Sequence, residues 1–212
     1  KIDHHALHIW PRESYMLIAL PNLDGSFTCT LFFPFEGSPS FAQLKTERDI
    51  LEFFQQQFPD VILLSPNLIE EYMSNPTSSL ATMRCCPWTF KDKALLIGDS
   101  AHAVVPFFGQ GMNCGFEDCA TLFELMDGFE ENNWDSLFKE YERQRKINAD
   151  SIADMALENF IEMRDKVADP SFHLRKKIES FLQQHFPTRF LPRYSMVSFS
   201  NIPYRKAVEI GL

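Results

Sequence analysis

A single carboxylate stands at the start of a glycine-rich stretch, where its chemistry could serve a ligand. Asp99 follows an apolar run at residues 94–98 and precedes a loop that holds Pro106, Gly109 and Gly111. An ionised carboxylate can only accept hydrogen bonds, so the hydroxyl groups of a sugar or sugar alcohol would suit it. Glycine lets backbone amides approach a ligand closely. The pattern indicates either an ordinary strand-to-helix connection or a pocket for a large, flat and partly anionic ligand.

The segment after this loop has the period of a helix that begins near Met112. The positive end of such a helix would face a ligand held by the loop and favour an anion by about 0.3–1 kcal/mol. Gly109, Gly111 and Gly115 read G-x-G-x-x-x-G, which is one residue longer than the dinucleotide fingerprint G-x-G-x-x-G. The motif therefore predicts ligand binding but does not by itself name the ligand.

Composition narrows the class of protein. The net charge of −9 argues against a nucleic-acid partner, because no basic stripe is available to neutralise phosphates. No stretch approaches the roughly 20 apolar residues that cross a bilayer. The five cysteines include no C-x-x-C pair, and no ligand cluster accompanies His4, His5 and His8. Neither a disulfide framework nor a metal site is expected.

The first 35 residues predict strands that include a hairpin around the sequence NLDGS. Alternation places Met16, Ile18 and Leu20 on one face of the first hairpin strand. It places Thr28, Thr30 and Phe32 on one face of the second. Packing against a helix and lining a cavity are both open for these faces.

The next elements are predicted from capping and breaking signals. Thr46 and Asp49 form a capping-box pattern that opens a helix over residues 47–58, and a second short helix follows at 65–73. Residues 78–90 are strand-like but irregular. An apolar strand beginning around Ala94 is expected to end at Gly98, which would leave Asp99 at the carboxyl edge of a sheet, where α/β folds bind ligands.

One long helix is predicted from Trp134 to about residue 167. Asn159 lies on its apolar stripe, four positions after Met155, and a buried amide needs a hydrogen-bonding partner. A structural asparagine is the simpler interpretation. Another helix is expected at 172–186, and the proline-containing tail from Arg189 onward is expected to be extended or irregular.

The run GDSAHAVVPFFGQGMNCGFEDC resembles the second FAD-contacting motif of the group A flavin monooxygenases, the aromatic-hydroxylase family. The runs LHIWPR, IALPN, DGSFTCTLF, NFIEMR and PRYSMVSFS resemble members of that family in the same order, over essentially all 212 residues. The resemblance implies a mixed α/β (α+β) fold. It comprises a partial substrate-roof β-sheet domain at 1–90, an FAD-binding segment of a Rossmann-like domain at 91–128, and a helical region at 129–212 that contributes to the substrate site.

The same resemblance assigns roles to individual residues. Asp99 would bond the ribityl chain of FAD, and Met112 and Asn113 would meet the pyrimidine end of its ring system. The remaining cofactor-binding residues would be Pro106, Gly109 and Gly111. Asn159 and Tyr194 would hold the carboxylate of an amino-acid substrate. The rest of the substrate site would be Met16, Ile18, Thr30, Phe32, Phe107, Phe108 and Gln110. No residue is expected to act as a catalytic acid or base, because the cofactor carries the chemistry.

The resemblance is strongest to family members that hydroxylate L-kynurenine at ring carbon 3, a step of tryptophan catabolism toward NAD. That reaction would consume NADPH and O₂ and pass through a flavin C4a-hydroperoxide. Another FAD-dependent aromatic hydroxylase with a different acid substrate is one alternative. An isolated fragment that neither binds FAD nor turns over substrate is the other.

The family's amino-terminal G-x-G-x-x-G region is not found in this sequence, so the chain is expected to be an internal or carboxyl-terminal fragment. Eukaryotic members attach to the cytosolic face of the mitochondrial outer membrane through a carboxyl-terminal hydrophobic segment, which is likewise not found here. The resemblance therefore implies a membrane location for the full-length protein only.

Overall fold

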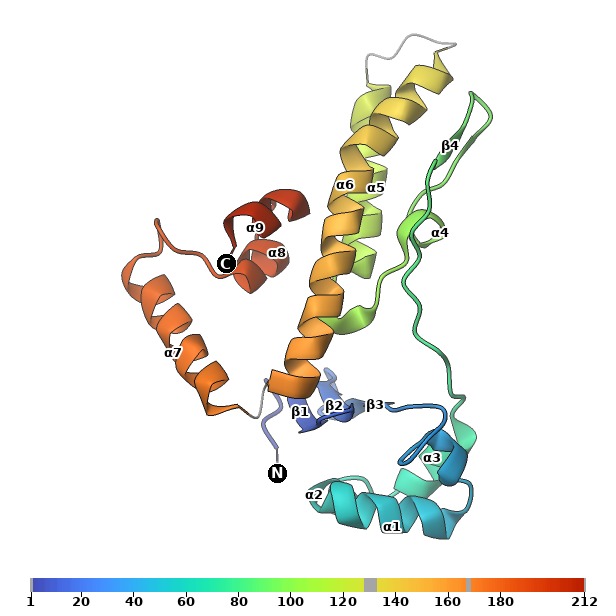
Figure 1. Ribbon diagram of the computed structural model, residues 1–212, viewed down its shortest axis with the longest axis vertical. Helices are drawn as coiled ribbons and strands as arrows, with labels where there is room; N and C mark the ends of the chain where they lie inside the picture. Colours follow the sequence, from blue (N-terminus) through green and yellow to red (C-terminus); the bar gives the residue numbers. More distant parts are fainter. Residues whose placement is uncertain (1, 128–132, 167–168, 212) are drawn as a thin grey trace. The chain divides into compact units, whose positions relative to one another are not determined.

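The computed structural model describes residues 2–127, 133–166 and 169–211 (Figure 1). These residues form two compact units. The first comprises Lys1–Ser79 with Glu162–Asp169, and the second comprises Leu80–Ile161 with Pro170–Leu212. The functional segments expected from the sequence divide the chain at residues 90 and 128 instead, and that functional division stays a prediction.

The first unit contains an antiparallel sheet with the order β1-β2-β3. Its strands are β1 (His8–Arg12), β2 (Tyr15–Pro21) and β3 (Phe27–Phe32). The hairpin predicted around NLDGS is confirmed, and its turn is closed by the backbone N–H of Asn22, which donates to the Ser26 carbonyl at 2.9 Å.

Three α-helices follow the sheet: α1 (Glu47–Gln57), α2 (Pro59–Ile62) and α3 (Leu68–Ser74), preceded by the short 3₁₀ helix η1 (Phe41–Gln43). The predicted capping box at the start of α1 is confirmed. The Thr46 side chain accepts from the Asp49 N–H at 3.2 Å, and the Asp49 carboxylate accepts from the Thr46 N–H at 3.0 Å. This exchange satisfies two backbone donors that a helix start otherwise leaves without partners.

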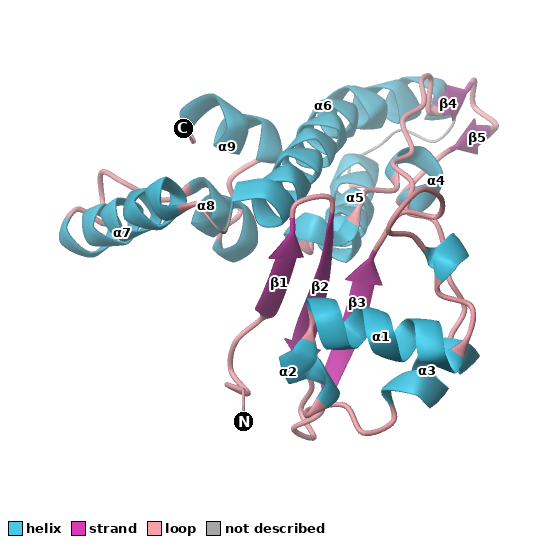
Figure 2. Ribbon diagram, turned by 60° about the horizontal axis from the view of Figure 1, so that its bottom comes forward, coloured by secondary structure: helices cyan, strands magenta, loops and turns pink. Residues whose placement is uncertain are grey.

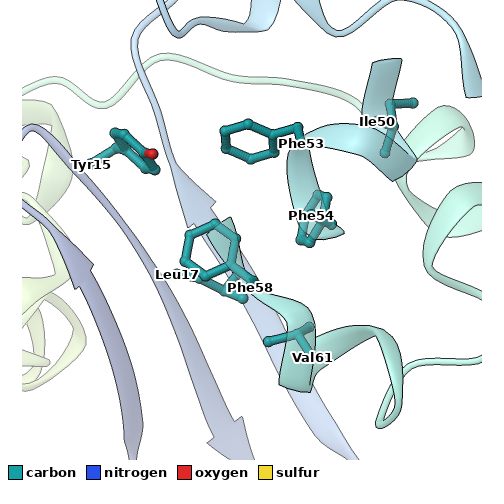
Figure 3. Packing of buried hydrophobic residues seen from close by; sticks show 7 residues of the cluster. All are labelled: Tyr15, Leu17, Ile50, Phe53, Phe54, Phe58 and Val61. Carbon is teal, nitrogen blue, oxygen red and sulfur yellow. The ribbon is translucent and has the colours of Figure 1, made fainter. Parts of the chain in front are cut away.

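Helix α1 crosses one face of the sheet (Figure 2). The aromatic and aliphatic stripe of α1 packs there on Tyr15 and Leu17 of β2, as Figure 3 shows. Phe58 and Ile50 are completely buried in this cluster. Phe53 lies edge-on to Phe54 and Phe58. Helix α1 thus covers the Tyr15–Leu17 face, not the Met16–Ile18 face for which helix packing and a cavity were both left open.

The opposite face of the sheet carries the four hairpin residues expected in a substrate pocket. Met16 pairs with Phe32 and Ile18 with Thr30, so all four side chains point to the same side. Met16 and Ile18 are buried, whereas Thr30 and Phe32 are half-buried. Strand β2 is thus covered on both faces for most of its length, although Leu20 on this second face is exposed.

In the second unit the expected apolar strand is much shorter than predicted. Strand β5 (Ala94–Leu95) pairs only with β4 (Thr89–Phe90), in an antiparallel ribbon of two residues each. Residues 96–98 have no strand partner among the residues that the structure describes, and a strand is stable only beside others. Asp99 consequently does not stand at a sheet edge; it is the first residue of helix α4 (Asp99–His102).

The rest of the second unit is helical. Helices α5 (Gly111–Met126) and α6 (Trp134–Ile161) run side by side, and the 3₁₀ helix η2 (Pro106–Phe108) precedes α5 (Figures 1 and 2). The long helix predicted from Trp134 is confirmed through Ile161, and it continues as the π-helix η3 (Glu162–Lys166). Residue 167, the expected end, lies outside the described residues. The predicted helix at 172–186 is confirmed as α7 (Pro170–His185).

The prediction of an irregular tail was wrong. Residues Arg193–Phe199 form α8 and Tyr204–Ile210 form α9, and α9 packs on α6. Pro192 and Pro203 are the N-cap residues of these two helices. A proline near a helix start removes no hydrogen bond, so both prolines are compatible with the helices that begin directly after them. Among the described residues, no helix combines the length and the apolar character needed to cross a membrane.

Candidate functional site

The turn before α4 presents the carboxylate of Asp99 at the surface. Gly98 has φ +62° and ψ −143°, a conformation that L-residues rarely adopt, and a Cβ added to it would meet no atom within 4 Å. Asp99 follows directly, with its side chain exposed. Its carboxylate pairs with no other group in the part of the chain that the structure describes. The turn therefore offers an unpaired acceptor beside a stretch of open backbone.

The loop into α5 continues this open surface. Gly109 ends η2 in the left-handed conformation, with φ +66°. A Cβ on Gly111 would meet only the Val104 side chain, at 3.6 Å, and one on Gly115 would meet nothing within 4 Å. No side chain caps the start of α5. Open glycine backbone, uncapped helix amides and a lone carboxylate are the features that suit FAD, an elongated ligand with hydroxyl groups and anionic groups.

Two of the expected ring-contacting residues lie at the start of α5. Met112 is 71% exposed and Asn113 is also exposed. Gln110 is buried, and its amide oxygen accepts from Asn113 Nδ2 at 3.2 Å and from the Tyr204 hydroxyl at 3.1 Å. In this structure Gln110 thus holds Asn113 in place. Sequence reasoning missed Tyr204 because it assigned the tail no helix.

The apolar part of the loop meets α6 and α8. Phe107 and Phe108 are buried. The ring of Phe107 lies 4.4 Å from that of Phe160, and Phe108 stacks on Tyr194 at 5.5 Å. Asn159 Nδ2 donates to the Phe107 carbonyl at 2.6 Å, which gives the amide on the apolar stripe one hydrogen-bonding partner.

The structure thus brings Asn159, Tyr194 and the loop residues together within the second unit. Pro106 is exposed at the start of the same loop. The remaining expected substrate residues, Met16, Ile18, Thr30 and Phe32, belong to the first unit. Their part in a common pocket stays a prediction.

Beneath the turn lies a buried charged cluster that sequence reasoning did not find. Asp118 of α5 has no exposed surface. Its Oδ2 accepts from the Gly98 N–H at 3.0 Å and from His102 Nε2 at 2.5 Å, and its Oδ1 accepts from Arg145 Nε at 2.6 Å. Arg145 lies four residues after Tyr141 on the apolar stripe of α6. A charged residue on such a stripe is the sequence signal that could have revealed the cluster.

The opposite charges in this cluster stabilise one another. Burial alone would lower the pKa of His102, but hydrogen bonds with Asp118 and Cys114 outweigh it and raise that pKa to about 10. For Asp118 the directions are reversed: burial alone would raise its pKa, but its hydrogen bonds with His102 and Arg145 outweigh burial and lower the pKa. At neutral pH the site therefore contains an aspartate between an imidazolium and a guanidinium.

Three of these residues also have the types that bind metals. The ligand atoms of His102, Cys114 and Asp118 lie within 4.8 Å of one another. However, Arg145 donates to the same carboxylate, and its Nη2 lies 3.4 Å from Cys114 Sγ. A metal cation would have to sit beside a guanidinium cation. The arrangement therefore suits an ion-pair network better than a metal centre.

Comparison with known proteins gives this site a family context. A family model described as an FAD binding domain matches residues 66–156. A kynurenine 3-monooxygenase from Flavobacterium psychrophilum is 53% identical over 211 residues, which cover 100% of this chain and 47% of that protein. One from Cytophaga hutchinsonii is 56% identical over 210 residues, covering 99% of this chain and 46% of that protein. One from Dictyostelium discoideum is 48% identical over 223 residues, covering 100% of this chain and 48% of that protein.

The resemblance to the FAD-dependent aromatic hydroxylases is confirmed. The chain spans about half the length of the kynurenine 3-monooxygenases that it matches.

Solved structures add support for the fold alone. The 2-methyl-3-hydroxypyridine-5-carboxylic acid oxygenase matches with a TM-score of 0.56 at 20% identity, over 74% of this chain and 41% of that chain. A variant of HpxO from Klebsiella pneumoniae, complexed with FAD, matches with a TM-score of 0.55 at 16% identity, over 89% of this chain and 49% of that chain. The mixed α/β class expected from the sequence is confirmed as part of an FAD-binding fold.

Proposed function

We propose that this chain is part of an FAD-dependent monooxygenase that hydroxylates L-kynurenine at ring carbon 3, with NADPH as the reductant and O₂ as the oxygen source. The observation that carries the proposal is identity of about one half, sustained over the whole chain, to kynurenine 3-monooxygenases. The open glycine loop beside an unpaired carboxylate supports the cofactor assignment.

In this proposal, the chain's own residues bind and orient the cofactor. Asp99 accepts hydrogen bonds from ribityl hydroxyl groups, and the uncapped start of α5, with Met112 and Asn113, faces the pyrimidine end of the ring. Pro106, Gly109 and Gly111 shape the loop between them. The positive end of α5 would favour negative charge on the ring system of a bound flavin. FAD, when bound, supplies the redox and oxygen-transfer chemistry.

For the substrate, Asn159 and Tyr194 are proposed to hold the amino-acid carboxylate. Phe107, Phe108 and Gln110 would form the wall between substrate and flavin, and the hairpin residues Met16, Ile18, Thr30 and Phe32 would line the aromatic ring. Aromatic walls exclude water from a site in which reactive oxygen must reach the substrate ring. The place of the full-length protein at the mitochondrial outer membrane belongs to the same proposal, and cell fractionation tests it.

The decisive experiment uses the full-length protein that carries this chain. The purified protein is assayed for NADPH oxidation and product formation with L-kynurenine and with a panel of other aromatic acids. Formation of 3-hydroxykynurenine, with a kcat/KM well above that for the other acids, supports the proposal. Preference for a different acid would instead identify another aromatic hydroxylase, and the absence of bound flavin would reject the cofactor assignment.

A second candidate concerns the 212 residues by themselves. Because they span about half of their relatives, the isolated chain is expected to bind no FAD and to have no activity. Purification of the isolated chain followed by an absorbance spectrum tests this. Stoichiometric flavin absorbance after desalting would contradict it.

A further inference from the structure

We propose that Asp118 is a positioning residue for cofactor binding. From its place in α5, its carboxylate binds the turn that presents Asp99. The inference rests on the proposed function, since it assigns the residue a role in FAD affinity. Asp118 itself has no exposed surface, so it acts through the groups that it holds.

The geometry places both ends of α4 on this one carboxylate. The Gly98 N–H, at the N-cap of α4, and His102 Nε2, at its last residue, both donate to Oδ2 of Asp118. A helix of one turn has little stability of its own. The direction in which Asp99 points therefore depends on an anchor outside α4, and Asp118 supplies it from α5.

Arg145 fixes the anchor in turn. Its Nε donates to Asp118, its Nη1 pairs with Glu117 at 2.8 Å, and its Nη2 donates to the Cys114 carbonyl at 3.2 Å. All three acceptors belong to α5, so the guanidinium of α6 holds that helix at three points. The planar fork of arginine suits this arrangement, which the single ammonium group of lysine cannot reproduce.

A side chain that only filled space here would have no need of charge. A buried carboxylate is costly unless several donors satisfy it, and an apolar residue would pack at least as well. Asp118 instead collects donors from three segments, namely the turn, α4 and α6. The result is that the lone carboxylate of Asp99 and the uncapped start of α5 are fixed relative to each other, and these are the two groups assigned to FAD.

The test is an FAD titration of the full-length apoprotein, followed by flavin fluorescence. Asp118→Asn keeps the size of the side chain but removes its charge and one acceptor oxygen. Loss of a charged hydrogen bond predicts about tenfold weaker FAD binding or more. Asp135→Asn, which removes an exposed carboxylate paired with Lys139 near the start of α6, is the matched control and should leave the affinity unchanged.

A double-mutant cycle separates positioning from general stabilisation. If Asp118 acts through Asp99, Asp118→Asn should weaken FAD binding much less in the Asp99→Asn background than in the wild type, because the group being positioned is already lost. Fully multiplicative effects of the two substitutions would overturn the inference. Unchanged affinity in a folded Asp118→Asn protein would also overturn it.

If Asp118→Asn does not fold, His102→Leu replaces it in the same cycle, because it removes the His102 donor and leaves the Asp118–Arg145 pair intact. Weaker FAD binding that disappears in the Asp99→Asn background supports the inference, and unchanged binding overturns it. The positioning role of Asp118 and the proposed function can be rejected separately. Loss of affinity in Asp99→Asn without any in the Asp118 or His102 variants rejects only the positioning role. A wild-type protein that binds no FAD rejects the proposed function and the inference together.

Discussion

Asn159 of α6 donates a hydrogen bond to the main-chain carbonyl of Phe107, 52 positions away in the sequence, at 2.6 Å. This bond ties the long helix to the loop between the expected cofactor and substrate positions. An asparagine on an apolar stripe thus orders the wall of the proposed substrate site, in addition to any contact with the substrate itself.

Replacing Asn159 tests its place on the substrate side of the loop. In the full-length enzyme, Asn159→Ala should raise the KM for substrate or abolish turnover, while FAD stays bound. Steady-state kinetics and flavin absorbance provide the two measurements. Ser151→Ala, at a half-buried position eight residues earlier on the same helix, removes a bond to the Ile147 carbonyl; it is the control and should change neither. Unaltered kinetics in Asn159→Ala would show that Asn159 does not bind the substrate.

Arg145 should be a major determinant of stability. Arg145→Ala leaves Asp118 charged and buried with one fewer partner, and breaking a buried pair in this way costs about 3–5 kcal/mol. Urea unfolding of the full-length protein measures the loss. The control lies two residues earlier on α6: Arg143 is exposed and pairs with Glu140, and its replacement should cost at most about 1 kcal/mol. Equal losses from the two substitutions would contradict the importance of the buried cluster.

The cluster also predicts a pH dependence. The pKa of His102 is about 10 in the folded protein, against 6.5 for the unperturbed side chain. A group with a raised folded pKa contributes its full stability below the unfolded value and loses it as pH rises toward the folded value. Stability should therefore decline between about pH 6.5 and pH 10.

Unfolding measured across this pH range, in the wild type and in His102→Gln, isolates the contribution of His102. The variant should be less stable at pH 6.5 and should lose less stability as the pH rises. Parallel pH profiles for the two proteins would show that the imidazolium–aspartate pair contributes nothing.

The capping box of the first unit offers an independent test. Thr46→Ala removes the side-chain acceptor for the Asp49 N–H and should reduce stability by about 1 kcal/mol. Thr77→Ala, at an exposed position outside any helix or strand, is the control. Thermal unfolding compares the two. A Thr46 variant as stable as the control would mean that α1 depends on its packing alone.

The elements that the sequence predicted well are those with signals inside one segment. The hairpin follows from alternation around a five-residue turn, α1 from its capping box and apolar stripe, and α6 from a period that continues over many turns. The strand expected at residues 94–98 depended on neighbouring strands, and the described chain supplies a partner for only two of its residues. The two helices of the tail were not predicted, because the sequence alone does not show that Pro192 and Pro203 stand where helices begin.

The candidate site divides in the same way. The glycine loop and the carboxylate of Asp99 can be recognised along the chain because they are contiguous. The Asp118 cluster cannot, because its donors come from three separate segments and meet only after folding. Gln110 was expected to contribute to the substrate site. Its bond with Asn113 is local, but its bond with Tyr204 depends on α9, 94 residues away, and no local pattern predicts it.

The cluster that anchors the turn also encloses a thiol. Cys114 is completely buried between His102 and Arg145, whereas Cys29, Cys86 and Cys119 are exposed and Cys85 is half-buried. A maleimide should label the three exposed thiols quickly and Cys114 only when α4, α5 and α6 separate. The slow phase of labelling would then report how often this part of the molecule opens, from a natural cysteine and without an introduced probe.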